Sequence, residues 1–278
     1  MSPNFASIGS TVGPREHAYG WTDLALYAAA VGAGPTQLAF LRDPSPKVLP
    51  TWGVIPAFDA VFEAVRLAGF SIEKLLHTAQ LTEQLSCPPS QGVVSTTATI
   101  LGIWDMRVGA LTQIESRSSV DGVLCSRTVW SLLVAGVGPF ESERAPGSLR
   151  TKPPKDAEPT FEETWHTQPN QALLYRLTGD INPIHAYPEA AHAAGLEQPI
   201  LHGLCTYGSA SRSALHALCA DDPERFLSFE ARFTKPVLPG QTLLTRGYLL
   251  EPGKAALTVQ VVETGELAIA NALFQFQE

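Results

Sequence analysis

The sequence lacks any hydrophobic run of about 20 residues, the length that a helix needs to cross a bilayer. We therefore expect no membrane span. It also lacks an excess of positive charge: 19 Lys and Arg stand against 27 Asp and Glu, a net charge of −8. Because proteins that bind nucleic acid normally show a basic surface, this balance argues against a nucleic-acid partner. A local group of cations would still suffice for a small anionic ligand.

Cysteine is scarce as well. The four cysteines form no CxxC pair and no cluster with histidine of metal-like spacing; they are Cys87, Cys125, Cys205 and Cys219. This pattern favours reduced thiols rather than disulfides or a metal site. The first residues lack the basic and apolar segments of a signal peptide, and the last four form no peroxisomal address. We therefore expect a cytoplasmic protein.

Phosphate-binding loops are also missing. Neither a Walker A motif nor a Gly-x-Gly-x-x-Gly loop occurs, and no close set of metal ligands appears. The sequence therefore predicts no ATP, no dinucleotide and no metal cofactor. A hydrophobic content of 45% with 17% charged residues predicts a globular chain with a substantial core.

The order of predicted elements suggests two similar halves. A segment with five prolines, residues 138–160, has the composition of a linker. Before it, residues 1–20 are predicted to form an extended arm. Helices are then predicted at 21–31 and 53–67, and strands at 93–97, 113–115 and 124–130. Turns between these strands are expected at Gly102, Gly109 and Asp121-Gly122. After the linker, helices are predicted at 171–177, 189–194 and 203–219, then strands at 228–234, 242–250, 255–262 and 266–275.

An alignment of the halves supports a duplication. When Tyr27 is laid on Tyr175, Pro35 falls on Pro183, an offset of 148 residues (175 minus 27). At the same offset three small or neutral residues of the first half fall on polar ones of the second: Gly32 on Asp180, Gly34 on Asn182 and Gln37 on His185. The alternative is coincidence between two apolar helices. Duplication predicts domains at 1–137 and 161–278, with the linker at 138–160.

The most unusual stretch holds an acid, an amide and an imidazole within six residues. These are Asp180, Asn182 and His185. Gly179 precedes them and a proline lies between Asn182 and His185, so they belong to a loop rather than to one helix face. The next long helix begins near Gly203, and its first turn presents free N–H groups. Such parts can move a proton beside a carbonyl whose oxygen gains charge. Alternatively, the acid is a turn residue, the imidazole caps a helix and the amide closes an Asx-turn.

This stretch resembles a known family. Residues 175–185 read Tyr-Arg-Leu-Thr-Gly-Asp-Ile-Asn-Pro-Ile-His, and residues 199–206 read Pro-Ile-Leu-His-Gly-Leu-Cys-Thr. They are similar to the signature of the MaoC-like, type-2 (R-specific) enoyl-CoA hydratases, with Thr178 where serine is usual and Leu196 where phenylalanine is usual. Likeness extends to residues 48–51 and 233–242. It is weakest at 77–140.

The resemblance implies an α+β fold, a double hotdog, in which each repeat wraps a curved antiparallel sheet around a central helix. It confines catalysis to the C-terminal repeat and implies reversible hydration of a trans-2-enoyl-CoA to a (3R)-3-hydroxyacyl-CoA. Asp180 and His185 would hold the water, Asn182 would orient it, and the Gly203 N–H would bind the thioester oxygen. Coenzyme A enters as part of the substrate, so no further cofactor is implied. We also expect a homodimer.

Several points stay open. Lys235, Arg232 and Arg212 are candidates for the coenzyme phosphates, and each could equally lie on solvated surface. A dehydratase of fatty acid or polyketide biosynthesis, a thioesterase and a non-catalytic acyl-binding subunit are the competing functions. Glycine at positions 32 and 34 suggests that the first repeat offers space for a bulky, branched or steroid acyl group.

Overall fold

The computed structural model describes residues 2–72, 75–147 and 150–278. Positions 73–74 of the predicted N-terminal repeat and 148–149 of the predicted linker lie outside the described residues, as does residue 1. Within the described residues, the stretch from 136 to 160 contains no helix or strand. A single sheet nevertheless connects the two sides of this stretch.

That sheet has ten strands in the described chain, and every neighbouring pair is antiparallel. Its order is β1-β3-β4-β5-β2-β7-β10-β9-β8-β6. The second half of this order is the first half reversed, as duplication predicts. The strands are β1 (Thr11–Tyr19), β2 (Leu75–Gln84), β3 (Gly92–Asp105), β4 (Gly109–Val120), β5 (Val123–Ala135), β6 (Phe161–His166), β7 (Phe226–Phe233), β8 (Thr242–Glu251), β9 (Lys254–Val261) and β10 (Leu267–Phe276).

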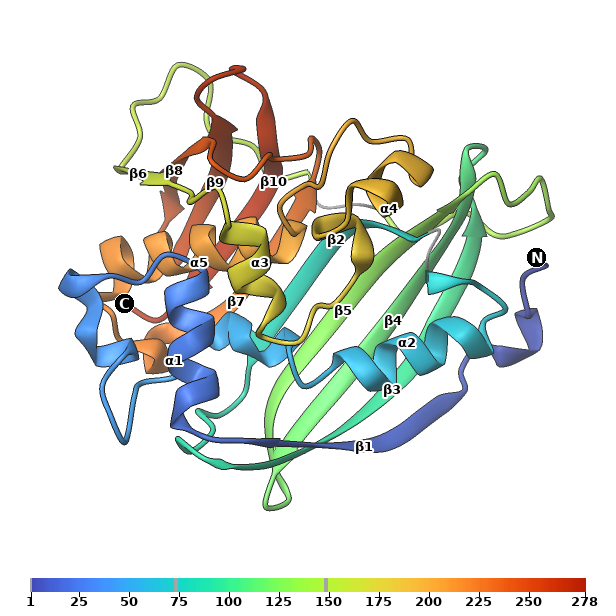
Figure 1. The fold of residues 1–278 in the computed structure, drawn as a ribbon, viewed down its shortest axis with the longest axis horizontal. Coiled ribbons are helices and arrows are strands. Elements are labelled where there is room, and N and C mark those ends of the chain that lie inside the picture. Colours follow the sequence, from blue (N-terminus) through green and yellow to red (C-terminus); the bar gives the residue numbers. More distant parts are fainter. Residues whose placement is uncertain (1, 73–74, 148–149) are drawn as a thin grey trace.

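Helices lie against the sheet or line its open side (Figure 1). The α-helices are α1 (Trp21–Ala30), α2 (Phe58–Leu67), α3 (Gln171–Arg176), α4 (Pro188–Ala193) and α5 (Gly203–Cys219). Short 3₁₀ turns are η1 (Phe5–Ser7), η2 (Pro35–Phe40), η3 (Pro50–Val54), η5 (Pro183–His185) and η6 (Pro223–Arg225). α2 contacts β3 and β4, and α5 contacts β7 to β10. Each half thus wraps five strands around one long helix, which confirms the double hotdog.

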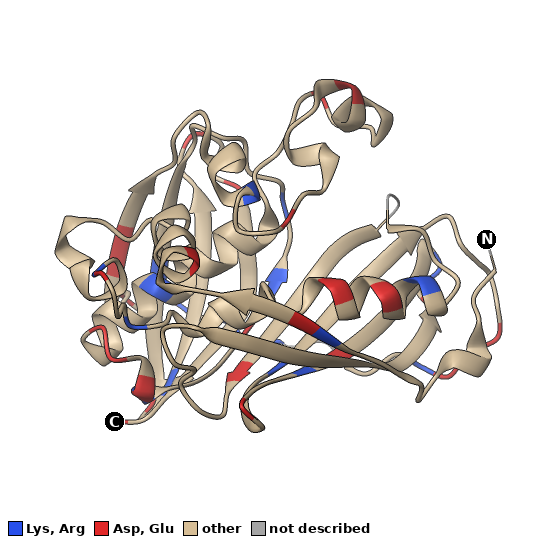
Figure 2. Cartoon of the chain, turned by 60° about the horizontal axis from the view of Figure 1, so that its bottom comes forward, with Lys and Arg blue, Asp and Glu red and all other residues tan. Residues whose placement is uncertain are grey.

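The periodicity of α2 explains why it packs this way. Phe58, Val61 and Val65 recur at helical spacing and are buried. Asp59 and Arg66 are exposed, and Figure 2 marks the acidic and basic positions along α2. The apolar stripe therefore docks on the sheet, and the charged side stays in water.

The two halves meet at strands β2 and β7. Ala79 pairs with Arg232 and Glu83 pairs with Ser228 across this seam. On the helical side, the rings of Tyr27 in α1 and Tyr175 in α3 lie 6.2 Å apart and are fully buried. These tyrosines are the pair that the sequence alignment superposed, so an approximate twofold axis passes close to both.

Several predicted elements need correction. The expected arm at 1–20 contains β1, an edge strand, and β2 and β6 were not predicted at all. Gly102 is not a turn but lies inside β3, where a Cβ would stand 2.3 Å from the Trp104 ring. The hairpin at Asp121-Gly122 is confirmed, with φ angles of 50° and 78°.

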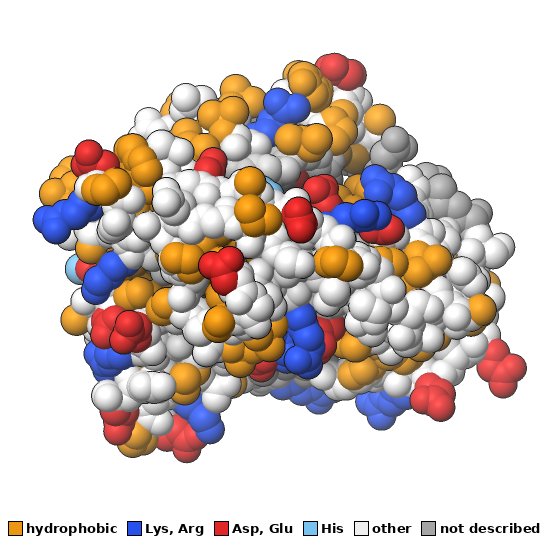
Figure 3. Space-filling model, turned by 90° about the horizontal axis from the view of Figure 1, so that it is seen from below, with side chains coloured by type: hydrophobic (Ala, Val, Ile, Leu, Met, Phe, Trp, Pro, Cys, Tyr) orange, Lys and Arg blue, Asp and Glu red, His pale blue; other side chains and the backbone are white. Residues whose placement is uncertain are grey.

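The surface shows no dominant charge on the face drawn in Figure 3, where acidic, basic and apolar side chains are intermixed. This face therefore lacks the extended basic area that nucleic-acid binding requires. Among the helices of the described residues, none is long and apolar enough to cross a membrane.

One glycine controls how closely α1 approaches α5. A Cβ at Gly208 would lie 2.6 Å from Val31 Cγ1 and 2.7 Å from the Tyr27 hydroxyl, and both neighbours are fully buried. Although alanine favours a helix over glycine, we predict that Gly208→Ala lowers the melting temperature by about 3 to 8 °C through overpacking. Gly34→Ala is the matched control, because no atom lies within 4 Å of its Cβ position. Thermal unfolding followed by circular dichroism checks both; an unchanged Gly208→Ala variant contradicts the close contact.

Candidate active site

The polar loop follows α3 and turns sharply at Gly179, whose φ of 130° is unfavourable for other residues. Asp180 comes next and is only 9% exposed. Its Oδ1 accepts a hydrogen bond from the Asn182 N–H at 3.3 Å. The carboxylate therefore faces the interior from a constrained turn.

His185 ends the 3₁₀ turn η5 and is buried. Its Nδ1 lies 2.8 Å from the Ile200 carbonyl oxygen. Since a carbonyl only accepts, the neutral ring carries its proton on Nδ1 and leaves Nε2 free to accept. The backbone thus fixes the tautomer of this histidine.

His202 packs against His185. The two rings stack with centroids 3.7 Å apart, and His202 is fully buried. By the same argument, His202 Nε2–H donates to the Asp180 carbonyl oxygen at 3.1 Å. His202 therefore ties the start of α5 to the loop that carries Asp180 and His185.

Gly203 is the first residue of α5, where backbone N–H groups have no partner within the helix. A Cβ at this position would stand 3.3 Å from the Phe233 ring, closer than most side chains tolerate. Glycine therefore keeps the positive end of α5 open to a developing oxyanion.

Asp180, Asn182, His185 and Gly203 all line one cavity of about 350 Å³. Its remaining wall is largely apolar and comes in good part from the N-terminal half, including Phe58, Phe62, Leu75, His77, Trp130 and Leu132. The reactive groups therefore lie in the C-terminal half, and a hydrophobic chamber opens beside them between the two halves.

Burial sets the charge of the site. It raises the pKa of the Asp180 carboxyl to about 6, against the opposing effect of the Asn182 N–H. It lowers the pKa of His185 to about 4, partly offset by the Ile200 carbonyl. Burial, together with the neighbouring His185, also holds the pKa of His202 well below its usual value. At pH 7 the site is one carboxylate beside two neutral imidazoles.

The same three residues could also hold a cation. Asp180, His185 and His202 each offer a ligand atom, and these atoms lie within 4.8 Å of one another. His202 Nδ1 is buried and has no hydrogen-bond partner. The expectation that the chain needs no metal stays a prediction.

The three predicted phosphate-binding cations are dispersed. Lys235 lines the cavity and forms an exposed ion pair of 2.9 Å with Glu266. Arg232 lies on β7, outside the cavity lining. Arg212 is 4% exposed and binds other parts of the chain, so its placement does not support contact with a coenzyme. Only Lys235 of the three adjoins the cavity.

Asn182 Oδ1 accepts from the Ile184 N–H at 3.3 Å, so this oxygen caps η5, in agreement with the Asx-turn alternative. That Asn182 orients the water stays a prediction. One further expectation changes. Glycines 32 and 34 do not line the cavity, and Gly32 packs on Trp165 instead. The first half does contribute wall to the cavity, but from α2, β2 and β5. Helical spacing at Phe58 and Phe62 was the sequence signal for this wall.

The chain matches two family models that together span most of its length. The MFE-2 hydratase 2 N-terminal domain matches residues 17–136, and the MaoC like domain matches residues 150–272. A relative in Dictyostelium discoideum, a probable enoyl-CoA hydratase 2, is 37% identical over 88% of this chain and 86% of its own length. A 3-hydroxyacyl-thioester dehydratase of Mycobacterium tuberculosis is also 37% identical, over 94% and 92%.

Solved structures agree. A MaoC-like dehydratase from Phytophthora capsici superposes with a TM-score of 0.87 at 28% identity, covering 99% of this chain and 98% of that one. A Mycobacterium tuberculosis protein described as a double hotdog superposes with a TM-score of 0.63 at 16% identity, covering 99% and 98%, which supports the fold. With the acid, imidazole and helix end of its signature gathered in one cavity, the chain is a hydro-lyase and belongs to the MaoC-like, type-2 enoyl-CoA hydratase family.

Proposed function

We propose that the chain is an (R)-specific 2-enoyl-CoA hydratase, which adds water reversibly to a trans-2-enoyl-CoA to give a (3R)-3-hydroxyacyl-CoA. The observation that carries this proposal is the shared cavity of Asp180, His185 and Gly203, continuous with an apolar chamber. The first two can hold a water, and the third presents a backbone donor where the thioester oxygen would lie.

The reaction proceeds in two proton transfers. A water donates hydrogen bonds to the Asp180 carboxylate and to His185 Nε2, two acceptors on residues that line the cavity. As its oxygen attacks C3, one proton passes to Asp180, because a carboxylate with a pKa of about 6 is a better base than an imidazole with a pKa of about 4. Charge moves to the thioester oxygen at the Gly203 N–H, and C2 then takes the proton back from the site.

The chamber suggests which acyl groups are accepted. Its volume of about 350 Å³ and its aromatic and aliphatic wall suit an acyl group well beyond four carbons. We therefore propose long, branched or steroid side-chain acyl groups as substrates. Loss of the enoyl-thioester absorbance tests this directly with crotonyl-CoA, a C12 enoyl-CoA and a sterol-side-chain enoyl-CoA. Chiral analysis of the product decides the stereochemistry; a (3S)-product overturns the assignment.

A dehydratase acting in biosynthesis is the second candidate. The relative in Mycobacterium tuberculosis with the printed name 3-hydroxyacyl-thioester dehydratase supports it. One catalyst serves both directions, so the carrier separates the two functions. A preference of at least tenfold in kcat/KM for acyl carrier protein thioesters over coenzyme A thioesters would favour the dehydratase.

Other features remain predictions from the sequence. These are the domain boundaries at 137 and 161, the cytoplasmic location, the need for no cofactor beyond the thioester, and the homodimer. Exposed apolar side chains lie on and after α3, at Leu173, Leu177 and Ile181. Such a group of side chains is compatible with a surface that a second copy of the chain would cover.

The catalytic pair generates a kinetic prediction. Asp180→Asn and His185→Gln should each lower kcat by on the order of 10² to 10⁴, because each removes a group that binds the attacking water. The double variant should be scarcely slower than the slower single variant, since both act on one water. Near-normal hydration in either single variant would falsify the assigned roles. Far-UV circular dichroism serves as the control for folding.

Asp180 also generates a stability prediction. Burial raises its pKa from the ordinary 3.8 to about 6, so the ionised carboxylate disfavours the folded state by about 3 kcal/mol above pH 6. Because the folded protein binds the extra proton, this loss of stability develops as the pH rises from 4 to 6. Asp180→Asn should therefore melt about 5 °C higher than the native chain at pH 7, and the gap should shrink to about a third of that near pH 4.5. Calorimetry at both pH values checks this; a gap that does not vary with pH contradicts the shifted pKa.

The apolar wall generates a specificity prediction. Leu75→Trp should fill part of the chamber, lowering kcat/KM for a C12 enoyl-CoA at least about tenfold while crotonyl-CoA stays within about threefold. Leu85→Trp is the matched control, because Leu85 is exposed and lies outside the cavity lining. Equal losses on both substrates would place the acyl group elsewhere.

A further inference from the structure

The N-terminal half retains the backbone of the catalytic loop. The turn η2 begins at Pro35 just as η5 begins at Pro183. Gln37 is the third residue of η2, and His185 is the third residue of η5. Gln37 therefore occupies the counterpart of the catalytic imidazole, and it is buried, with 3% of its surface exposed.

The long helices are related in the same way. On α5, Cys205 Sγ lies 3.3 Å from the carbonyl oxygen of Ala30, the last residue of α1. In the other half, Ile55 just before α2 lies close to the residue after α3, because a Cβ on Gly179 would stand 3.6 Å from Ile55 Cγ2. Phe62 follows Ile55 by seven residues, and Arg212 follows Cys205 by seven. Since Phe62 lines the acyl chamber, Arg212 stands where a second chamber would have its wall.

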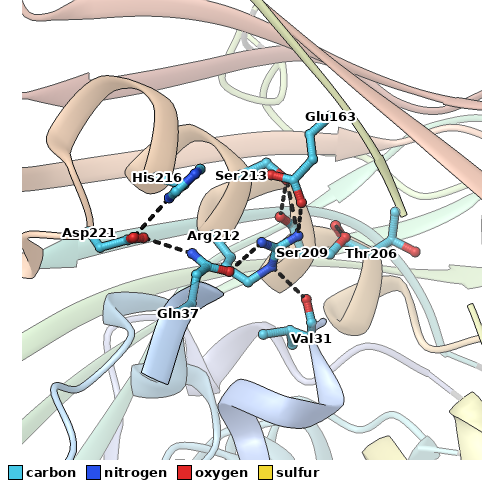
Figure 4. Close-up of polar contacts among 9 residues, drawn as sticks. All are labelled: Val31, Gln37, Glu163, Thr206, Ser209, Arg212, Ser213, His216 and Asp221. Carbon is cyan, nitrogen blue, oxygen red and sulfur yellow. Dashed lines mark hydrogen bonds and ion pairs between the residues drawn. The ribbon is translucent and has the colours of Figure 1, made fainter. Parts of the chain in front are cut away.

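Figure 4 shows the polar contacts that the Arg212 guanidinium makes there. Its Nε donates to the Val31 carbonyl oxygen at 3.1 Å, and Nη1 donates to Gln37 Oε1 at 2.6 Å. Its Nη2 pairs with the Glu163 carboxylate. Two of these partners belong to the N-terminal half and one to the C-terminal half, so one side chain joins both.

The contacts continue outward to the surface. Gln37 Nε2 donates to Asp221 Oδ1 at 2.7 Å, and His216 Nδ1 lies 2.8 Å from Asp221 Oδ2. Lys47 Nζ donates to the Asp221 carbonyl oxygen at 3.2 Å. Both functional ends of the Gln37 amide are therefore bound, one to Arg212 and one to Asp221.

The other end of the second site is closed as well. Gly53 follows Trp52 as Gly203 follows His202, but the adjoining hollow measures only about 20 Å³. The Trp52 ring packs on Tyr19 with centroids 4.7 Å apart. No thioester fits there.

We propose that the counterpart of the active site has become a lock between the two halves, made of Val31, Gln37, Glu163, Arg212 and Asp221. The lock holds the N-terminal half, and with it the acyl wall, in register with the catalytic loop. The positioning of the acyl wall rests on the proposed function, whereas the joining of the two halves does not.

The path to the active site is short. Arg212 binds the residue after α1, and α1 also carries Tyr27, whose ring packs against Tyr175. Tyr175 in turn lies 4.8 Å from the His202 ring, measured between centroids. A shift of α1 is therefore passed to the stacked histidines as well as to the chamber.

Removal of the guanidinium tests the lock. Arg212→Met leaves the buried Gln37 amide oxygen and the half-buried Glu163 carboxylate without their shared partner, so the melting temperature should fall by about 8 °C or more. Arg246→Met is the matched control: Arg246 pairs at 2.5 Å with Glu162, the residue next to Glu163, but this pair is partly exposed and its loss should cost no more than about 2 °C. A drop for Arg212→Met no larger than that of the control overturns the lock.

A double-mutant cycle tests whether the lock joins the halves. Gln37→Met should melt about 3 to 6 °C lower, and adding it to Arg212→Met should lower the melting temperature by less than about 2 °C more. Additive losses mean that Arg212 stabilises the C-terminal half alone, which overturns the proposal. If Arg212→Met does not fold, Gln37→Met decides: a melting temperature within 1 °C of the native chain overturns the lock.

A kinetic ratio tests the positioning role. At 20 °C, Arg212→Met should lower the ratio of kcat/KM for a C12 enoyl-CoA to that for crotonyl-CoA at least about fivefold, and Arg212→Lys should restore part of it. An unchanged ratio in a folded, less stable variant overturns the positioning role, but it leaves the joining of the two halves intact. If the native chain does not hydrate enoyl-CoA at all, the proposed function is wrong. The melting temperatures still test whether the lock joins the two halves.

Discussion

Two backbone carbonyls hold the active site in a reactive state. The Ile200 carbonyl accepts from His185 and the Asp180 carbonyl accepts from His202, so each stacked ring keeps one bare nitrogen. Burial then prevents both rings from taking a second proton near neutrality. The carboxylate is left as the strongest base in the cavity. Without these two hydrogen bonds the imidazoles could turn, and the water would lose one of its acceptors.

In the proposed function, the chemistry and the recognition of the acyl group come from different halves of the chain. Asp180, His185 and Gly203 belong to the C-terminal half, whereas α2, β2 and β5 of the N-terminal half form much of the acyl wall. The continuous sheet and the Arg212 contacts hold them together. The half without the proposed catalytic residues therefore still contributes to the site, because much of the cavity wall comes from it.

How much of this could be read from the sequence depended on local signals. The loop around Asp180, the long helix from Gly203 and the Asp121-Gly122 hairpin carry glycine, proline and periodicity that act over a few residues. Strand β2 carries no such signal. It lies in the middle of the sheet, where β5 and β7 flank it, and its polar and apolar residues do not alternate cleanly. The role of Arg212 depends on contacts with Val31 and Gln37, some 180 residues away along the chain, so no local pattern could reveal it.

The seam between β2 and β7 has a consequence for synthesis of the chain. Glu83 pairs with Ser228, which follows it by 145 residues (228 minus 83). At ribosomal rates of about 5 to 20 residues per second, β2 waits roughly 7 to 30 s for its partner. During that time the nascent N-terminal half exposes a bare strand edge, the kind of surface that pairs with other chains. The chain is therefore most vulnerable to aggregation while it is being translated, and a chaperone that covers this edge would act before the catalytic residues have even been made.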